Sequence, residues 1–252
     1  MGRWLTIRVR QALAELNDRV REWFRRLVRK LILLILADMD LVARLRDAGS
    51  TARFEEEFLS DAAAFKTRVA FHRAMVKEIQ IKDGLHLEFG VYKGDSINRF
   101  AALVPDAIWY GFDSFEGLPE AWTLGAKAGA FDVGGKLPPV HGNVRLTKGF
   151  FEQTLPGFVA QHRGAKIALL HVDCDLYSAT KTILANVREM LVPGSLVIFD
   201  ELINYHGWEQ GEYKAFMEFV QEHGVSYEYV AYNRTGPQVA VRILGMNAPD
   251  AL

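Results

Sequence analysis

The first residues that could do chemistry lie between positions 86 and 96, His-Leu-Glu-Phe-Gly-Val-Tyr-Lys-Gly-Asp-Ser. An apolar run reaches Glu88 and then breaks at Gly90 and Gly94. Glycine lets the backbone approach a ligand without a Cβ atom in the way, and Ser96 opens a helical run whose first amides would face that ligand. The spacing differs from the dinucleotide fingerprint. The pattern therefore predicts a strand, a turn and a helix, either at a nucleoside site or as an ordinary connection.

A second carboxylate, Asp113, ends the apolar run 108–113, about 25 residues after Glu88. Ligands of open α/β sheets bind beyond the carboxyl ends of the strands. A carboxylate at that place could accept hydrogen bonds from ribose hydroxyls. It could equally cap the turn that begins at Ser114.

Four more carboxylates follow two later apolar runs. Asp173 and Asp175 come after the first run, and Asp200 and Glu201 come after the second. Converging carboxylates repel one another unless a cation lies among them, and all-oxygen ligands suit a hard ion such as Mg²⁺. The alternative is a set of separate solvated or helix-capping acids. The sequence therefore predicts a divalent-metal site with that alternative left open.

Strands and helices must alternate to bring these residues to one edge. The apolar runs predict five strands near 85–90, 107–113, 143–147, 166–173 and 194–200, with helical patterns between most of them. Two more, at 226–232 and 238–244, read as a hairpin. We therefore expect an α/β, Rossmann-like, doubly wound and mostly parallel seven-stranded sheet with a C-terminal antiparallel hairpin, preceded by N-terminal helices.

The chain divides into three parts by composition. Residues 1–48 form a basic amphipathic helical extension, residues 49–84 a helical lead-in that follows a break at Gly49-Ser-Thr, and residues 85–252 the main domain. Within the last part, residues 120–142 are rich in glycine and proline. Loops of this length in compact domains are usually functional or disordered, so we expect a lid here.

The N-terminal extension has apolar residues every three or four positions and arginines on its other sides, typical of an amphipathic helix. Three interpretations are open. The helix packs on the core or on a second subunit, which would make a homodimer; residues 1–37 contact an anionic membrane surface, which Trp4, Trp23 and Phe24 would suit; or the segment is a partly disordered arm.

Composition narrows the class of protein. The net charge of −1 is unevenly distributed along the chain. Residues 1–30 hold nine Lys and Arg and three Asp and Glu, so the rest of the chain has a net charge of −7. A core without a basic excess does not favour nucleic-acid binding. A single cysteine, Cys174, excludes an intramolecular disulfide and a multi-cysteine zinc site. We expect a cytoplasmic protein, with membrane association as a variant, and no secretory signal.

Taken in order, five blocks resemble class I S-adenosylmethionine-dependent methyltransferases, specifically the macrocin O-methyltransferase family of sugar O-methyltransferases. The blocks are LEFGVYKGDS (87–96), YGFDSFEGLPE (110–120), GGKLP with NVRLTKGFFEQTLP (134–138 and 143–156), HVDCDLYSATKTIL (171–184) and LVPGSLVIFDEL (191–202). The resemblance covers about residues 85–243. It implies a cofactor, S-adenosylmethionine, and a hydroxyl-bearing small molecule or glycan as acceptor.

The resemblance also implies roles for individual residues. The cofactor would be bound by Glu88, Gly90, Tyr92, Gly94, Ser96, Asp113, Ser114, Phe115, Gly149 and Phe150. Asp173, Asp200 and Glu201 match the family's Mg²⁺ ligands, although the family commonly has Asp at the last position. Metal coordination would stabilise the developing alkoxide of the acceptor. Asp173 would then be catalytic, and His206, just after the metal strand, is our candidate general base.

Two other functions fit parts of the pattern. Asp173-Cys-Asp175 is an Asp-x-Asp that could hold Mg²⁺ and a sugar diphosphate in a glycosyltransferase, but Glu88 would repel phosphate. The glycine spacing and Glu88 also argue against a nicotinamide-dependent oxidoreductase. A non-catalytic scaffold with a methyltransferase-like domain is the second alternative, and it would bind neither S-adenosylmethionine nor metal.

Overall fold

A computed structural model of the chain describes residues 2–122 and 125–246, with side chains from residue 17 onward. Its strands are β1 (Ala63–Phe65), β2 (Leu85–Phe89), β3 (Trp109–Asp113), β4 (Val144–Lys148), β5 (Ile167–Val172), β6 (Leu196–Phe199), β7 (Ser226–Asn233) and β8 (Val239–Gly245). Its helices are α1 (Gly2–Ala37), α2 (Met39–Phe58), α3 (Arg68–Lys77), α4 (Asp95–Leu103), α5 (Phe151–Gln161), α6 (Tyr177–Val187) and α7 (Glu212–His223), with short 3₁₀ turns at Arg188–Met190 and Trp208–Gln210.

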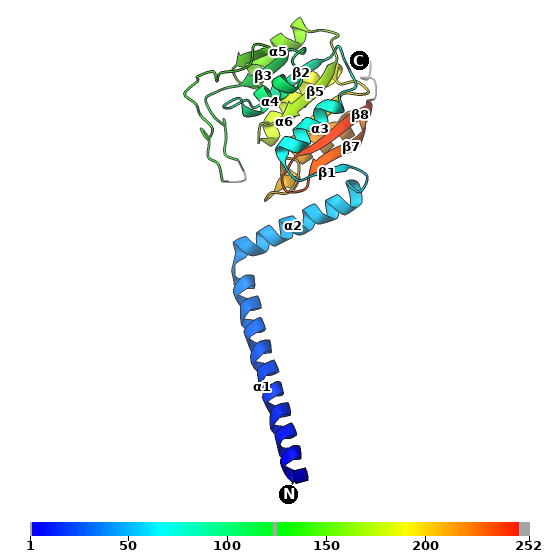
Figure 1. Cartoon of the computed structure of the whole chain (residues 1–252). Coiled ribbons are helices and arrows are strands. Elements are labelled where there is room, and N and C mark those ends of the chain that lie inside the picture. Colours follow the sequence, from blue (N-terminus) through cyan, green and yellow to red (C-terminus); the bar gives the residue numbers. More distant parts are fainter. Residues whose placement is uncertain (1, 123–124, 247–252) are drawn as a thin grey trace. The chain divides into compact units, whose positions relative to one another are not determined.

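The strands form one sheet in the order β1-β7-β8-β6-β5-β2-β3-β4 (Figure 1). β6, β5, β2, β3 and β4 run parallel, while β8 is antiparallel to both β6 and β7. The predicted fold class, with its mostly parallel sheet and C-terminal hairpin, is confirmed. The sheet has eight strands and not seven, because the three residues of β1 pair with β7 inside a lead-in that the sequence indicated as helical.

Helices cover both faces of this sheet (Figure 1). α3 and α4 contribute Phe71, Met75 and Phe100 to one apolar core, and α5, α6 and α7 contribute to the other. Strand β2 serves both faces because its side chains alternate. Leu87 and Phe89 enter the core under α5–α7, so His86 and Glu88 point to the face covered by α3 and α4. This alternation buries Glu88 completely.

The chain separates into two compact units, residues 1–46 and 47–252. The helical break expected at Gly49-Ser-Thr is not there, because α2 continues through these residues. The break falls at Asp38, between α1 and α2. The Asp38 carboxylate accepts a hydrogen bond from the amide of Leu41 at 3.0 Å, which is how an aspartate begins a helix.

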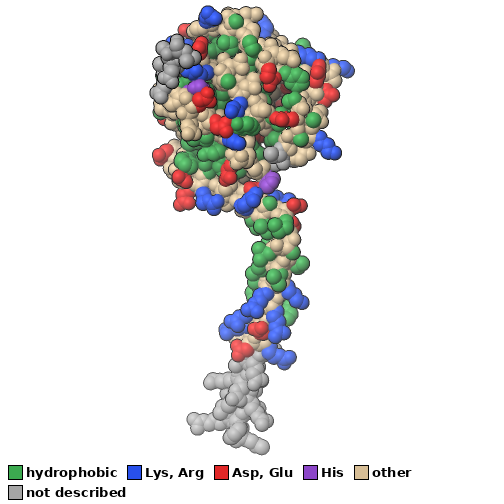
Figure 2. Space-filling view, turned by 180° about the vertical axis from the view of Figure 1, so that it is seen from behind, with side chains coloured by type: hydrophobic (Ala, Val, Ile, Leu, Met, Phe, Trp, Pro, Cys, Tyr) green, Lys and Arg blue, Asp and Glu red, His purple; other side chains and the backbone are tan. Residues whose placement is uncertain are grey.

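Helix α1 carries both apolar and basic side chains over its described part, residues 17–37 (Figure 2). Val20, Trp23 and Phe24 are more than half exposed, and all six residues from Leu31 to Leu36 are exposed. Trp4 and the other apolar positions before residue 17 lie outside the side chains that the structure describes. Among the described residues, no helix has an apolar stretch long enough to cross a bilayer.

Candidate functional site

A cavity of about 360 Å³ opens at the carboxyl ends of β2, β3, β5 and β6. Parallel strands bring their carboxyl ends to one edge, which is where ligands bind in such sheets. Predicted residues that line it are Gly90, Tyr92, Ser96, Asp113, Ser114, Phe150, Asp173, Asp200 and Glu201. Glu88, Gly94, Phe115, Gly149 and His206 are not among its lining residues.

The turn after β2 depends on glycine, but for a reason that differs from the expected one. A Cβ atom on Gly90 would lie 1.6 Å from the carbonyl oxygen of Asp173, and its φ is +92°. Glycine is therefore required here by the backbone at the end of the adjacent strand, whether or not a ligand is bound. Gly94 has φ +84° and precedes the first residue of α4. Tyr92 also has a positive φ, 48°, so the whole turn is tightly bent.

Asp113 holds this turn in place. One carboxylate oxygen, Oδ2, accepts hydrogen bonds from the amides of Val91 at 2.8 Å and Tyr92 at 2.7 Å. The other, Oδ1, accepts from the amide of Phe115 at 2.6 Å. The expected turn cap is thus present together with a position on the cavity wall. Each carboxylate oxygen has two lone pairs, so these three bonds leave one lone pair, on Oδ1, for a further donor.

Glu88 belongs to a buried network behind the cavity. Its Oε1 accepts a hydrogen bond from the Ser96 hydroxyl at 2.9 Å, and its Oε2 lies 3.0 Å from Nδ1 of His171. The other ring nitrogen of His171 lies 3.3 Å from Oδ1 of Asp200. Burial by itself would lower the pKa of His171, but its bonds to Asp200 and Glu88 raise that pKa to about 10. The imidazolium therefore bridges two carboxylates.

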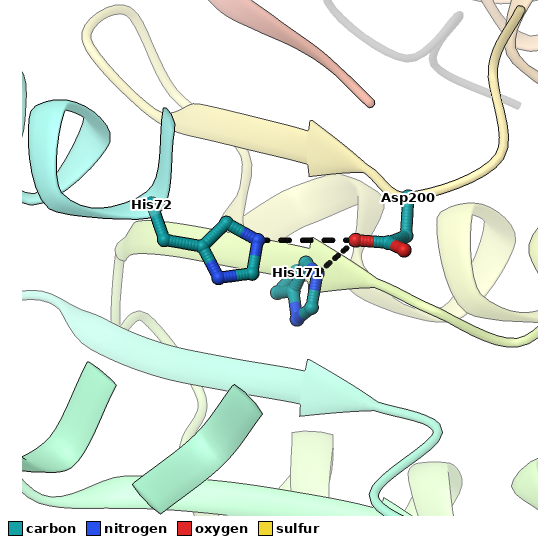
Figure 3. Close-up of side chains that lie close together, drawn as sticks. All are labelled: His72, His171 and Asp200. Atoms are coloured by element: carbon teal, nitrogen blue, oxygen red, sulfur yellow. Dashed lines mark hydrogen bonds and ion pairs between the residues drawn. The ribbon is translucent and has the colours of Figure 1, made fainter. Parts of the chain in front are cut away.

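A second histidine points at the same oxygen of Asp200 (Figure 3). His72, on α3, is fully buried, and its Nε2 lies 3.8 Å from Asp200 Oδ1. Burial lowers the pKa of His72 to about 4, so the ring is neutral. Its Nδ1 lies 3.2 Å from the guanidinium of Arg99, which can only donate. The proton of His72 is therefore on Nε2, directed toward Asp200, and that nitrogen is not available as a metal ligand.

Arg68, one helical turn before His72 on α3, lies across the acidic pair that the sequence assigned to metal. Its Nη2 bonds to Oδ2 of Asp173, and its Nε is 2.9 Å from Oδ1 of Asp200. Burial and the charge of Asp200 raise the pKa of Asp173 to about 8. Burial would also raise the pKa of Asp200, but the hydrogen bond with His171, the nearby ring nitrogen of His72 and the charge of Arg68 lower it below its ordinary value.

Glu201 and Glu212 form a buried carboxylate pair beside this group. Glu212 Oε2 accepts a hydrogen bond from the amide of Glu201 at 3.0 Å. Among the described residues, Glu201 Oε2, Glu212 Oε1 and the Tyr205 hydroxyl are buried without a hydrogen-bond partner. Burial raises the pKa of both glutamates well above the ordinary value. Buried polar atoms are normally satisfied, so these oxygens mark a place that suits a cation.

The residues present fit a divalent ion in ligand type. Single oxygen atoms of Asp173, Asp200 and Glu201 lie within 4.8 Å of one another, and such oxygens are the ligands that Mg²⁺ prefers. No pattern in the sequence pointed to Arg68, His72 and Glu212. Arg68 lies 105 residues before Asp173, whereas Glu212 lies only 11 residues after Glu201 but outside the motif blocks. Only the packing of α3 and α7 onto the sheet brings them here.

His206, the candidate base, lies elsewhere. Its Nδ1 is 2.7 Å from the carboxylate of Asp47, and its side chain is half exposed. The structure therefore does not support the expectation that His206 reaches an acceptor in the cavity, because α2 supplies a carboxylate that holds the ring. Asp175 does line the cavity, with a positive φ of 64°.

Comparison with known proteins gives matches over the main domain. Residues 87–202 match a family model described as a methyltransferase domain. The chain is 30% identical over 142 residues to the 8-demethyl-8-(2,3-dimethoxy-alpha-L-rhamnosyl)-tetracenomycin-C 4'-O-methyltransferase of Streptomyces olivaceus. This alignment covers 46% of the chain and 51% of the relative, so the chain spans about half the length of the curated relative it matches.

Solved structures match over a longer stretch. The crystal structure of the calicheamicin methyltransferase CalS11 superposes with a TM-score of 0.57 at 27% identity, covering 69% of this chain and 77% of that one. Its apo form, described as a TDP-rhamnose 3'-O-methyltransferase, gives 0.50 at 26% identity, over 69% and 78%. The O-methyltransferase NovP gives 0.51 at 20% identity, over 70% and 79%, and shows the fold alone.

Proposed function

We propose that this chain, a class I methyltransferase of the macrocin-like type by its fold and by the match over residues 87–202, methylates a hydroxyl group of a sugar-bearing small molecule with S-adenosylmethionine. The observation that carries the proposal is the cavity itself. It is lined by the glycine turn and Asp113 and also by the carboxylates Asp173, Asp200 and Glu201. We interpret the first group as the cofactor half and the second as the acceptor half of one site.

Asp113, Tyr92 and Ser114 would hold the cofactor's nucleoside. S-adenosylmethionine supplies, when bound, an electrophilic methyl group on a sulfonium. Asp113 is fixed by three backbone amides, so its remaining lone pair, on Oδ1, is oriented before a ribose arrives. Such preorganisation lowers the entropy cost of binding. Glu88 would act behind the cavity by positioning Ser96, to which it is hydrogen-bonded.

Asp173, Asp200 and Glu201 would hold Mg²⁺ or another hard divalent ion. Such an ion lowers the pKa of a bound hydroxyl and orients it. Asp173 lines the cavity and is the candidate to receive the acceptor's proton. His206 is not among the residues that line the cavity. The acceptor would lie against Leu118, Trp122 and Phe131, apolar residues that also line the cavity.

Two similar proteins support a proposal for the acceptor class. Their names specify a methylated rhamnosyl group and TDP-rhamnose. We propose a deoxysugar hydroxyl, carried by a natural product or a nucleotide, as the acceptor. Apolar faces and vicinal hydroxyls in one ring suit a wall of aromatic side chains next to a metal-binding group.

The first test is calorimetric titration of the full chain with S-adenosylmethionine. Asp113→Ala should lose about tenfold or more in affinity, because it removes an acceptor and loosens the turn. Asp83→Ala, an exposed aspartate outside the cavity, is the matched control and should bind like the wild type. Wild-type protein that binds no S-adenosylmethionine would contradict the proposal and would favour a non-catalytic scaffold.

We propose further that α1 contacts an anionic membrane surface. From residue 17 to residue 37 the helix holds six Arg and Lys against Asp18 and Glu22. Two such helices side by side would repel each other, whereas anionic lipid headgroups attract them. A homodimer through this helix is the competing arrangement.

A further inference from the structure

The carboxylates assigned to a metal already hold a cation of the protein's own. Arg68 contacts Asp173 Oδ2 through Nη2 and lies 2.9 Å from Asp200 Oδ1 through Nε. It reaches across from α3, 105 residues before Asp173 in sequence. A guanidinium and a divalent ion at the same carboxylate oxygens repel each other. Arg68 and the metal therefore compete for these oxygens unless the metal binds through other atoms.

The partners of Asp200 decide between these two cases. Its Oδ2 accepts a hydrogen bond from Gln238 at 3.0 Å, and its Oδ1 is shared by His171 and Arg68. Two donors already face Oδ1, which has two lone pairs, so a metal ion bound to this oxygen requires one of them to withdraw. His171 is fully buried and Gln238 is 5% exposed, whereas the Arg68 side chain is 39% exposed and lines the cavity. Arg68 is the partner with room to leave.

Arg68 is bound to the two carboxylates in different ways. Its Nη2 donates a hydrogen bond to Asp173 Oδ2, whereas its Nε is close to Asp200 but makes no hydrogen bond of good geometry to any described atom. A bidentate arginine–carboxylate pair, in which two parallel N–H groups meet two oxygens of one carboxylate, is the strong arrangement. Here the guanidinium bridges two different carboxylates and interacts with Asp200 mainly through charge, so an ion of higher charge can replace it there.

The neighbouring oxygens show that one guanidinium does not satisfy the group. Glu201 is 8% exposed, and its Oε2 has no hydrogen-bond partner among the described residues. Glu212 next to it is fully buried with Oε1 equally unpartnered. Arg68 donates a hydrogen bond to neither of these two oxygens. They provide ligand capacity that Arg68 leaves unused.

We propose that Arg68 is a built-in competitor of the divalent cation: it neutralises Asp173 and Asp200 while no metal is bound, and it withdraws from them when metal binds. The inference rests on the proposed function, because it presumes a metal site at these carboxylates. It adds that metal affinity is set by an arginine outside the ligand set. Replacing Arg68 should tighten metal binding, which is the opposite of what the loss of a ligand or of a supporting residue does.

The test is Mn²⁺ binding to the full chain, measured by calorimetry and by the electron-spin resonance signal of free Mn²⁺. Arg68→Ala should bind Mn²⁺ about tenfold or more tightly than the wild type, because a positive charge a few ångströms from the ion is removed. Arg68→Lys keeps the charge and should lie between the two. Arg73→Ala, an exposed arginine on the same helix, is the matched control and should equal the wild type.

Thermal melting gives a second readout that needs no turnover. Without metal, Arg68→Ala should melt below the wild type, because two close carboxylates lose their counter-charge. With Mn²⁺ or Mg²⁺, its melting temperature should rise more than that of the wild type. If Arg68→Ala does not fold, Arg68→Lys carries the same comparison.

Unchanged or weaker Mn²⁺ binding by Arg68→Ala, or no Mn²⁺ binding by any form, would overturn the inference. Neither outcome depends on the cofactor, since the titration with S-adenosylmethionine and Asp113→Ala reports on the other half of the cavity. Failure of the metal competition and failure of the methyltransferase proposal are therefore distinguishable.

Discussion

His171 joins the two halves of the site, because its ring nitrogens face Glu88 and Asp200 at 3.0 and 3.3 Å. From the sequence it reads as a buried strand residue, and it is fully buried. Its partners could not be predicted, because Glu88 lies 83 residues away and Asp200 lies 29 away. The carboxylates were predictable as strand ends. The cations that neutralise them come from neighbouring strands and helices.

We expect a pH-dependent cost for removing this imidazole. The pKa of His171 is raised in the folded protein to about 10, above the ordinary 6.5. A raised pKa stabilises the fold fully below the unfolded value, and this stabilisation is lost as the pH rises through the folded value. At pH 7, His171→Asn should lower the free energy of unfolding by about 3–5 kcal/mol, because it leaves buried carboxylates without their partner.

Denaturant unfolding at a series of pH values measures this effect. The difference between wild type and His171→Asn should shrink as the pH approaches about 10. His162→Asn is a control, since His162 is partly exposed at the end of α5 and its ring hydrogen-bonds only a helix carbonyl among the described atoms. A difference that stays constant across the range would show that His171 acts by packing and not by charge.

At the scale of elements, the turn between β2 and α4 both contacts a neighbouring strand end and lines the cavity. Asp173 pairs with the end of β2, its amide bonding the Phe89 carbonyl at 2.8 Å, and its own carbonyl occupies the space beside Gly90. The sequence predicted this turn correctly as a glycine-dependent connection. It could not indicate that a distant strand end, the one that follows β5, sets the requirement.

Gly90→Ala should therefore destabilise the protein by well over 1 kcal/mol, for two reasons. The new Cβ atom must displace the backbone that follows β5, and alanine must adopt a positive φ. Gly164→Ala is a close control. Gly164 has φ +80°, but no atom lies within 4 Å of the place that its Cβ would take, so only the conformational cost of about 1 kcal/mol should remain. Equal losses in thermal or denaturant unfolding would contradict this account.

The whole molecule has two units with different surfaces. Residues 47–252 bury their apolar side chains in two cores. Within residues 17–37, the apolar side chains from Leu31 to Leu36 are exposed on every side of the helix, whereas basic residues dominate the turns before them. A helix of this kind needs an apolar environment for one part and an anionic one for the other.

Charge reversal tests the membrane proposal in the intact chain. Arg25, Arg26 and Arg29 replaced together by Glu should reduce co-sedimentation with phosphatidylserine vesicles at least several-fold, since each basic residue near such a surface contributes about 1 kcal/mol. Lys82, Arg163 and Lys166, all exposed on the other unit, give the control triple reversal. Equal recovery for both triples would remove the membrane proposal, and a dimer in solution would favour the competing one.

The sequence by itself determined the α/β fold class and the order of strands and helices. It also determined which carboxylates stand at strand ends. These features are local: period-two and period-3.6 patterns, glycine at bends, and the rule that parallel strands end at one edge. Alternation along β2 also fixes that Glu88 and Phe89 face opposite sides.

Only the tertiary structure decided what those carboxylates contact. Packing of α3 brings Arg68 and His72 close to the carboxylates after β5 and β6. Helix α7 adds Glu212 beside Glu201. On α2, Asp47 forms an ion pair with His206. Except for Glu212, these partners are distant along the chain, and no periodicity encodes which helix crosses which strand end. The charge balance of a buried site depends on such tertiary contacts. For this physical reason the acids at the strand ends were predictable, whereas Glu212 and the partners that neutralise the acids were not.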